Sequence, residues 1–110
     1  MVSVIVDTVT LTTIINQCFS YAMDARFSSQ DQNNFLVEGK RLRGHLLNLL
    51  SAQFDAGSVQ LAAANKHLTS VNTSLSQSAT VLANTAETLN NIGILVGTLD
   101  KLLSIATSFG

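Results

Sequence analysis

Residues 61–106 read LAAANKHLTSVNTSLSQSATVLANTAETLNNIGILVGTLDKLLSIA, and a seven-residue repeat runs through the whole stretch. The first positions of the repeat are all apolar: Leu61, Leu68, Leu75, Leu82, Leu89, Val96 and Leu103. The fourth positions are Ala64, Val71, Ser78, Thr85, Ile92, Leu99 and Ala106. This spacing aligns both sets along one side of an α-helix, as in helices that pack against other helices. The stretch therefore predicts a long helix over residues 58–105 with its leucines buried.

A first helix is predicted over residues 3–26, upstream of the repeat. Leu11, Ile15, Cys18 and Ala22 follow helical spacing. The residues before Leu11 are rich in β-branched valine and threonine, which favour extended structure, so the helix is least secure there.

A second helix is predicted over residues 30–55. Ser28 with Asp31, or Ser29 with Gln32, has the spacing of a capping box that satisfies the free amides of a new helix. Two adjoining apolar stripes follow, one formed by Phe35, Leu42, Leu46 and Leu49 and the other by Leu47, Leu50 and Phe54. So broad an apolar face predicts a helix that contacts two neighbours.

The chain contains no proline, so helix boundaries depend on glycines and caps. Gly57 and Ser58 suit the end of one helix and the start of the next, although the apolar spacing also continues across Gly57. Gly93 and Gly97 fall outside the apolar seam. We therefore expect one all-α domain over residues 1–110, an antiparallel bundle of three long helices with coiled-coil-like packing. A short fourth helix at the C-terminal end is the variant.

Charged residues form only 12% of the chain, against about 25% in average proteins, and the net charge is −1. Helix surfaces poor in charge favour contact with another protein or a membrane. A near-neutral chain offers little attraction to nucleic-acid phosphates, so nucleic acid is not an expected partner. The one basic cluster, Lys40, Arg41, Arg43 and His45, is interpreted as a solvated helix face, with a phosphate or anionic-lipid contact as the alternative.

Residues that could carry chemistry are scattered. Cys18 lies among apolar neighbours and is expected to be a buried thiol. Neither His45 nor His67 has a second metal ligand one helical turn away, and no two acidic residues share a helix face at that spacing. We therefore expect no metal, no cofactor and no enzymatic activity.

The expected function is a non-catalytic interaction or assembly module that self-associates or binds a helical partner. A single third helix would be longer than the first two helices can cover, and its far end is the most apolar part. The expected interface residues are Leu82, Leu89, Ile92, Val96, Leu99 and Leu103. The alternative is a membrane-acting protein that uses the apolar stretch from Ile92 to Phe109, in which Gly93 and Gly97 form a GxxxG motif.

Overall fold

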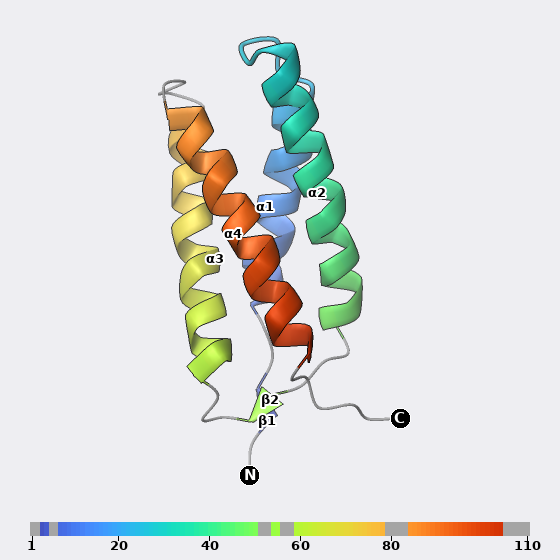
Figure 1. Ribbon diagram of the computed structural model, residues 1–110, viewed down its shortest axis with the longest axis vertical. Coiled ribbons are helices and arrows are strands. Elements are labelled where there is room, and N and C mark those ends of the chain that lie inside the picture. The colour runs from blue at the N-terminus through green and yellow to red at the C-terminus, as the bar shows by residue number, and fades with distance from the viewer. Residues whose placement is uncertain (1–2, 5–6, 51–53, 56–58, 79–83, 105–110) are drawn as a thin grey trace.

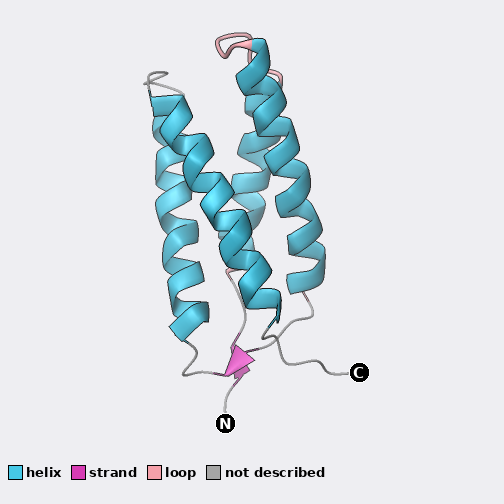
Figure 2. Cartoon of the chain, viewed as in Figure 1, coloured by secondary structure: helices cyan, strands magenta, loops and turns pink. Residues whose placement is uncertain are grey.

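The computed structural model describes residues 3–4, 7–50, 54–55, 59–78 and 84–104. Within these residues the chain is all-helical apart from one pair of two-residue strands (Figure 2). The helices are α1 (Thr8–Ala22), α2 (Ser29–Leu49), α3 (Val59–Ser78) and α4 (Thr85–Ser104), and the strands are β1 (Ser3–Val4) and β2 (Phe54–Asp55). The described part is elongated, measuring 47 × 22 × 19 Å.

The four helices form a bundle in which the chain ascends α1, descends α2, ascends α3 and descends α4 (Figure 1). Helix α1 contacts α2 and α3, and α4 contacts α3 and α2. Strands β1 and β2 pair antiparallel at one end of the bundle. They tie the N-terminal segment to the connection between α2 and α3.

The single helix expected over residues 58–105 is wrong, because this stretch contains the two helices α3 and α4. These helices pack against each other and run in opposite directions, which one continuous helix cannot do (Figure 1). The second helix is also no short C-terminal addition, since α3 and α4 each contain 20 residues. Helix α3 ends at Ser78 and α4 begins at Thr85, and both Gly93 and Gly97 lie inside α4.

The buried side of the heptad repeat shifts between these two helices. In α3 the buried side chains occupy the first and fourth positions, as expected: Leu61, Ala64, Leu68, Val71 and Leu75. In α4 they occupy the fourth and seventh positions: Thr85, Thr88, Ile92, Leu95, Leu99 and Leu102. Leu68 and Leu75 are therefore buried as predicted, Leu89 is only half-buried, and the side chain of Leu82 lies outside the described residues.

The other predicted boundaries are too wide. Helix α1 begins at Thr8 rather than residue 3, where β1 forms instead, and α2 ends at Leu49 rather than residue 55. The capping prediction for α2 is confirmed, since the amide of Asp31 donates to Ser28 Oγ at 3.1 Å. The expected turn at Gly57 and cap at Ser58 lie outside the described residues.

The core between α1 and α2 depends on a close approach at Gly39. A Cβ atom at Gly39 would lie 3.0 Å from Phe19 Cε1 and 3.1 Å from Cys18 Cβ, closer than ordinary contact. The rings of Tyr21, Phe27 and Phe35 pack against one another in tilted and edge-to-face arrangements, with centroids 4.9 to 5.3 Å apart. Aromatic pairs at this separation stabilise a core beyond the area they bury.

Asp7 caps the first turn of α1 and joins it to α3. Its carboxylate accepts from the Thr10 amide at 3.0 Å and from Thr10 Oγ1 at 2.6 Å, while its own amide donates to Asn65 Oδ1 at 2.8 Å. These hydrogen bonds from Thr10 lower the pKa of Asp7 below the ordinary 3.8. Because the folded pKa lies below the unfolded one, the stabilisation is present above the unfolded pKa and is lost as pH falls through the folded pKa.

Asp7→Ala should therefore reduce the free energy of unfolding by about 1 kcal/mol at neutral pH, the usual cost of losing a helix cap. The difference from the wild type should shrink as the pH falls below about 4, since the wild-type carboxylate becomes protonated. Urea denaturation at both pH values measures it. Asp7→Asn keeps an acceptor without the titration and serves as the control, and a difference independent of pH would contradict the cap.

Candidate interaction surface

The residues expected to form an interface lie largely inside the chain's own bundle. Ile92 and Leu99 are 0% exposed, and Leu89, Val96 and Leu103 are half-buried against the same core. Leu82 lies outside the residues whose side chains are described. The expectation of a partner at these positions rests on an uncovered seam, whereas the seam side chains described in α4 are buried or half-buried against the other helices. Contact of these residues with a partner stays a prediction, and the exposed surfaces of the bundle are the other candidates.

The same packing bears on the membrane alternative. The apolar side chains of α4 that would enter a lipid surface include Ile92, Leu95, Leu99 and Leu102, which are buried in the bundle. Membrane contact through this stretch would require α4 to leave its neighbours. In the described part of the chain, no helix combines the length and apolar character needed to cross a membrane.

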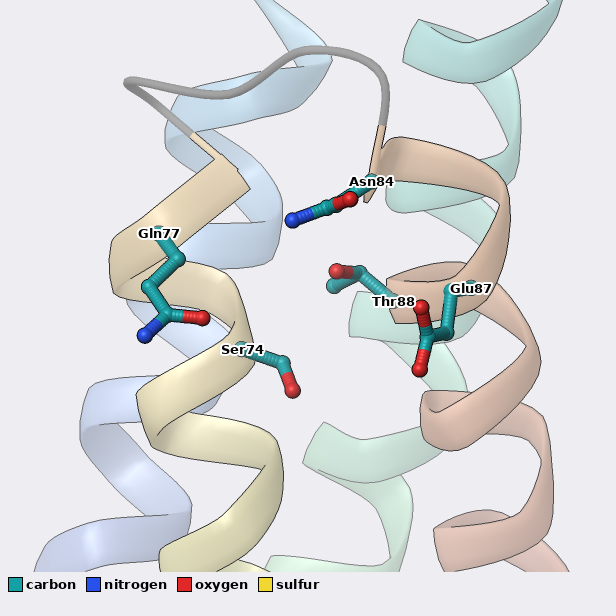
Figure 3. A pocket seen from close by; sticks show the side chains of 5 residues that line it. All are labelled: Ser74, Gln77, Asn84, Glu87 and Thr88. Atoms are coloured by element: carbon teal, nitrogen blue, oxygen red, sulfur yellow. The ribbon is translucent and has the colours of Figure 1, made fainter.

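A small polar pocket opens between α3 and α4 near their connection (Figure 3). Ser74 reaches from α3 toward α4, and Asn84 and Thr88 reach back toward α3. Gln77 and Glu87 complete the lining. The volume is about 60 Å³, room for about two water molecules. One carboxylate among four neutral groups gives no pair for acid–base chemistry.

The titratable side chains elsewhere are dispersed. Cys18 is fully buried, as predicted. Its burial, and to a smaller extent the negative charge of Glu38, raise the pKa of the thiol to about 12. His45 Nε2 lies 2.8 Å from Asp100 Oδ1, which joins α2 to α4 through an ion pair when the histidine is protonated. Partial burial lowers the pKa of His67. Within the described ranges, no three histidine, cysteine or acidic residues gather as a metal site.

An apolar groove lies at the lower end of the bundle, where the start of α1 passes the end of α2. We call it the α1–α2 groove, with a volume of about 390 Å³. Its lining residues are Thr8, Val9, Thr12 and Thr13 from α1, Leu46 from α2 and Leu50 from the C-cap of α2. Val9 is 78% exposed and Leu50 is 59% exposed. The groove therefore presents large apolar side chains to the surroundings.

The sequence prediction missed this surface for an identifiable reason. Leu47 and Leu50 were assigned to a second apolar stripe of α2, expected to contact a neighbouring helix. In the structure α2 does contact two helices, α1 and α4, but Leu47 remains 66% exposed. Leu47 and Leu50 are thus apolar without being covered by the described chain, and the sequence shows the stripe but not that it stays exposed.

The electrostatics around the groove are nearly neutral on the α1 side. No charged residue occurs from Thr8 to Ala22. On the α2 side, the guanidinium of Arg43 lies over the Phe19 ring, 5.6 Å from its centroid, and Arg41 pairs with Glu38 at 3.1 Å. Removing water from an uncharged helix beside exposed leucines costs little free energy, because no charged group loses its hydration.

Comparisons with protein-family models, curated proteins and solved structures gave no match for this chain.

Proposed function

We propose that the chain is a non-catalytic helical interaction module that binds a second copy of itself or a helical partner. The binding surface is the α1–α2 groove together with Leu47, and not the C-terminal seam. The observation that carries the proposal is that the exposed side chains of Val9 and Leu50 line one groove, with the exposed Leu47 next in sequence to the lining residue Leu46. Exposed apolar clusters of this kind mark interaction sites on proteins whose other surfaces are polar.

The remaining chemistry of the described residues supports a binding role over a catalytic one. An active site needs a nucleophile, a base or a metal held within hydrogen-bond reach of a substrate. Cys18 is protonated and buried, and the polar pocket beside Glu87 holds a single carboxylate. The α1–α2 groove, in contrast, offers a partner a concave surface with exposed apolar side chains.

Within the bundle we propose coiled-coil-like packing between antiparallel helices. Burial at the first and fourth heptad positions of α3 supports this arrangement, since those positions form the seam of such helices. The α4 seam, at the fourth and seventh positions, is rotated toward α2. Helix α4 thereby meets both α2 and α3.

Site-specific photocrosslinking tests the interaction surface. A photoreactive p-benzoylphenylalanine at Leu50 should crosslink one protein species, another copy or a distinct helical protein, identified by mass spectrometry of the joined peptides. The matched control carries the same group at Ala62, which is exposed on α3. Val9→Asp in the Leu50-labelled chain should reduce the yield by about tenfold, because a charge in an apolar contact weakens binding. Equal yields at Leu50 and Ala62 would overturn the proposal.

A further inference from the structure

Helix α1 carries an exposed stripe with a self-complementary pattern. The stripe consists of Val9, Thr13, Asn16 and Ser20 on one side of the helix and Met23 at its C-cap, spaced four and three residues apart. Val9 and Met23 are 78% and 81% exposed, the highest values among the large hydrophobic residues described. The three residues between them are polar and uncharged. The stripe therefore has an apolar side chain at each end and uncharged polar side chains between them.

This pattern matches itself when reversed. If two copies of α1 pack antiparallel with Asn16 facing Asn16, each Val9 meets the partner's Met23, since both lie seven residues from the centre. We infer that the chain forms a symmetric homodimer through antiparallel pairing of α1, with Met23 of each copy seated in the α1–α2 groove of the other. The inference rests on the proposed function and names the partner as a second copy.

The groove offers Met23 an apolar site of adequate size. Val9, Leu46 and Leu50 line it with hydrocarbon, and its volume of about 390 Å³ leaves room for an unbranched thioether side chain. The hydroxyls of Thr12 and Thr13 donate to the carbonyl oxygens of Thr8 and Val9, at 2.7 and 3.1 Å. Both hydroxyls already donate a hydrogen bond within the helix. Burying them therefore leaves no donor without an acceptor, and their methyl groups remain available for contact.

The charges at the two ends permit this pairing. No charged residue occurs from Thr8 to Ala22, so two copies of α1 can approach without like charges facing each other. Beyond the helix, the paired Asp24 and Arg26 of one copy would lie level with Asp7 of the other. Because Arg26 pairs with Asp24, these two residues together bring no net charge to the partner's Asp7.

Disulfide trapping tests the register. Asn16→Cys should oxidise to a covalent dimer by itself, because the residue lies on the two-fold axis. Val9→Cys and Met23→Cys should form a mixed disulfide only when the two proteins are combined, since like positions lie about 21 Å apart along the helix axes and a disulfide needs Cα atoms within about 7 Å. Cys18 is buried with its thiol pKa near 12, so it does not compete. Self-crosslinking of Val9→Cys would indicate parallel pairing and overturn the inference.

Light scattering tests the dimer itself. The purified wild type should show twice the 11.7 kDa mass of one chain, and Met23→Asp should raise the dimer dissociation constant at least about tenfold. Val59→Asp replaces another exposed hydrophobic residue, on α3, and should leave the mass unchanged. Circular dichroism of both variants checks that they stay folded. A wild type that is monomeric at high concentration overturns the homodimer, whereas crosslinking of a different protein at Leu50 would still support the proposed function.

Discussion

Leu99→Asp should unfold the chain at neutral pH, whereas Ile94→Asp on the same helix should leave it folded. Leu99 is completely buried in the bundle, and Ile94 is 52% exposed. A carboxylate at Leu99 would have to be protonated or lose its hydration, and either change costs several kcal/mol when no partner is present. That cost is comparable to the whole stability of a small domain, about 5 to 15 kcal/mol.

The comparison separates two roles for the same leucine. If Leu99 formed an interface between chains, its replacement by aspartate would give a folded protein of lower mass. If Leu99 belongs to the core of one chain, the replacement removes the helical circular dichroism signal and the cooperative unfolding transition. Ile94→Asp should change the free energy of unfolding by about 0.5 kcal/mol or less, as is usual on a surface. A folded, cooperative Leu99→Asp variant would contradict the bundle core.

The helical class was predictable because local signals agree with one another. The apolar spacing of Leu11, Ile15 and Cys18 and the cap formed by Ser28 with Asp31 both depend on residues close in sequence. Such signals survive folding because they act within one or two helical turns. The burial of Leu68 and Leu75 was predictable for the same reason.

The reversal between α3 and α4 was missed because the heptad repeat does not distinguish one long helix from two antiparallel helices. A leucine every seven residues satisfies either one long helix or two shorter helices that use different sides of the repeat. The weaker signals did exist: Ser78 and Thr85 interrupt the seam, and Asn84 with Glu87 has the spacing of a capping box at the start of α4. Folding back also covers the apolar side chains without a partner, which a continuous helix could not do.

The candidate surface could not be predicted from the sequence because it depends on which apolar stripe the tertiary fold leaves uncovered. Leu42 in α2 and Leu50 at its C-cap are both leucines, yet Leu42 is buried and Leu50 is largely exposed. Only the positions of α1 and α4 around α2 decide between them. Val9 was likewise interpreted as part of a β-branched run, and its place in the groove depends on α2 lying beside α1.

The reversal of direction between α3 and α4 places the apolar side chains of the heptad stretch in the core of one chain. Spin labels at Ala62→Cys and Lys101→Cys test it, since both positions are exposed and lie in the first turn of α3 and the last turn of α4, which are at the same end of this helix pair. The bundle is only 22 × 19 Å in cross-section, and the buried Cys18 should remain unlabelled.

Pulsed electron paramagnetic resonance should give a distance below about 35 Å, measured with excess unlabelled protein so that only labels within one chain contribute. Helix axes packed side by side lie about 8 to 10 Å apart, and the label arms account for most of the remainder. A continuous helix would separate the same residues by about 58 Å, at 1.5 Å per residue. A distance distribution centred near that longer value would contradict the account, and one confined to the shorter range is the result that it predicts.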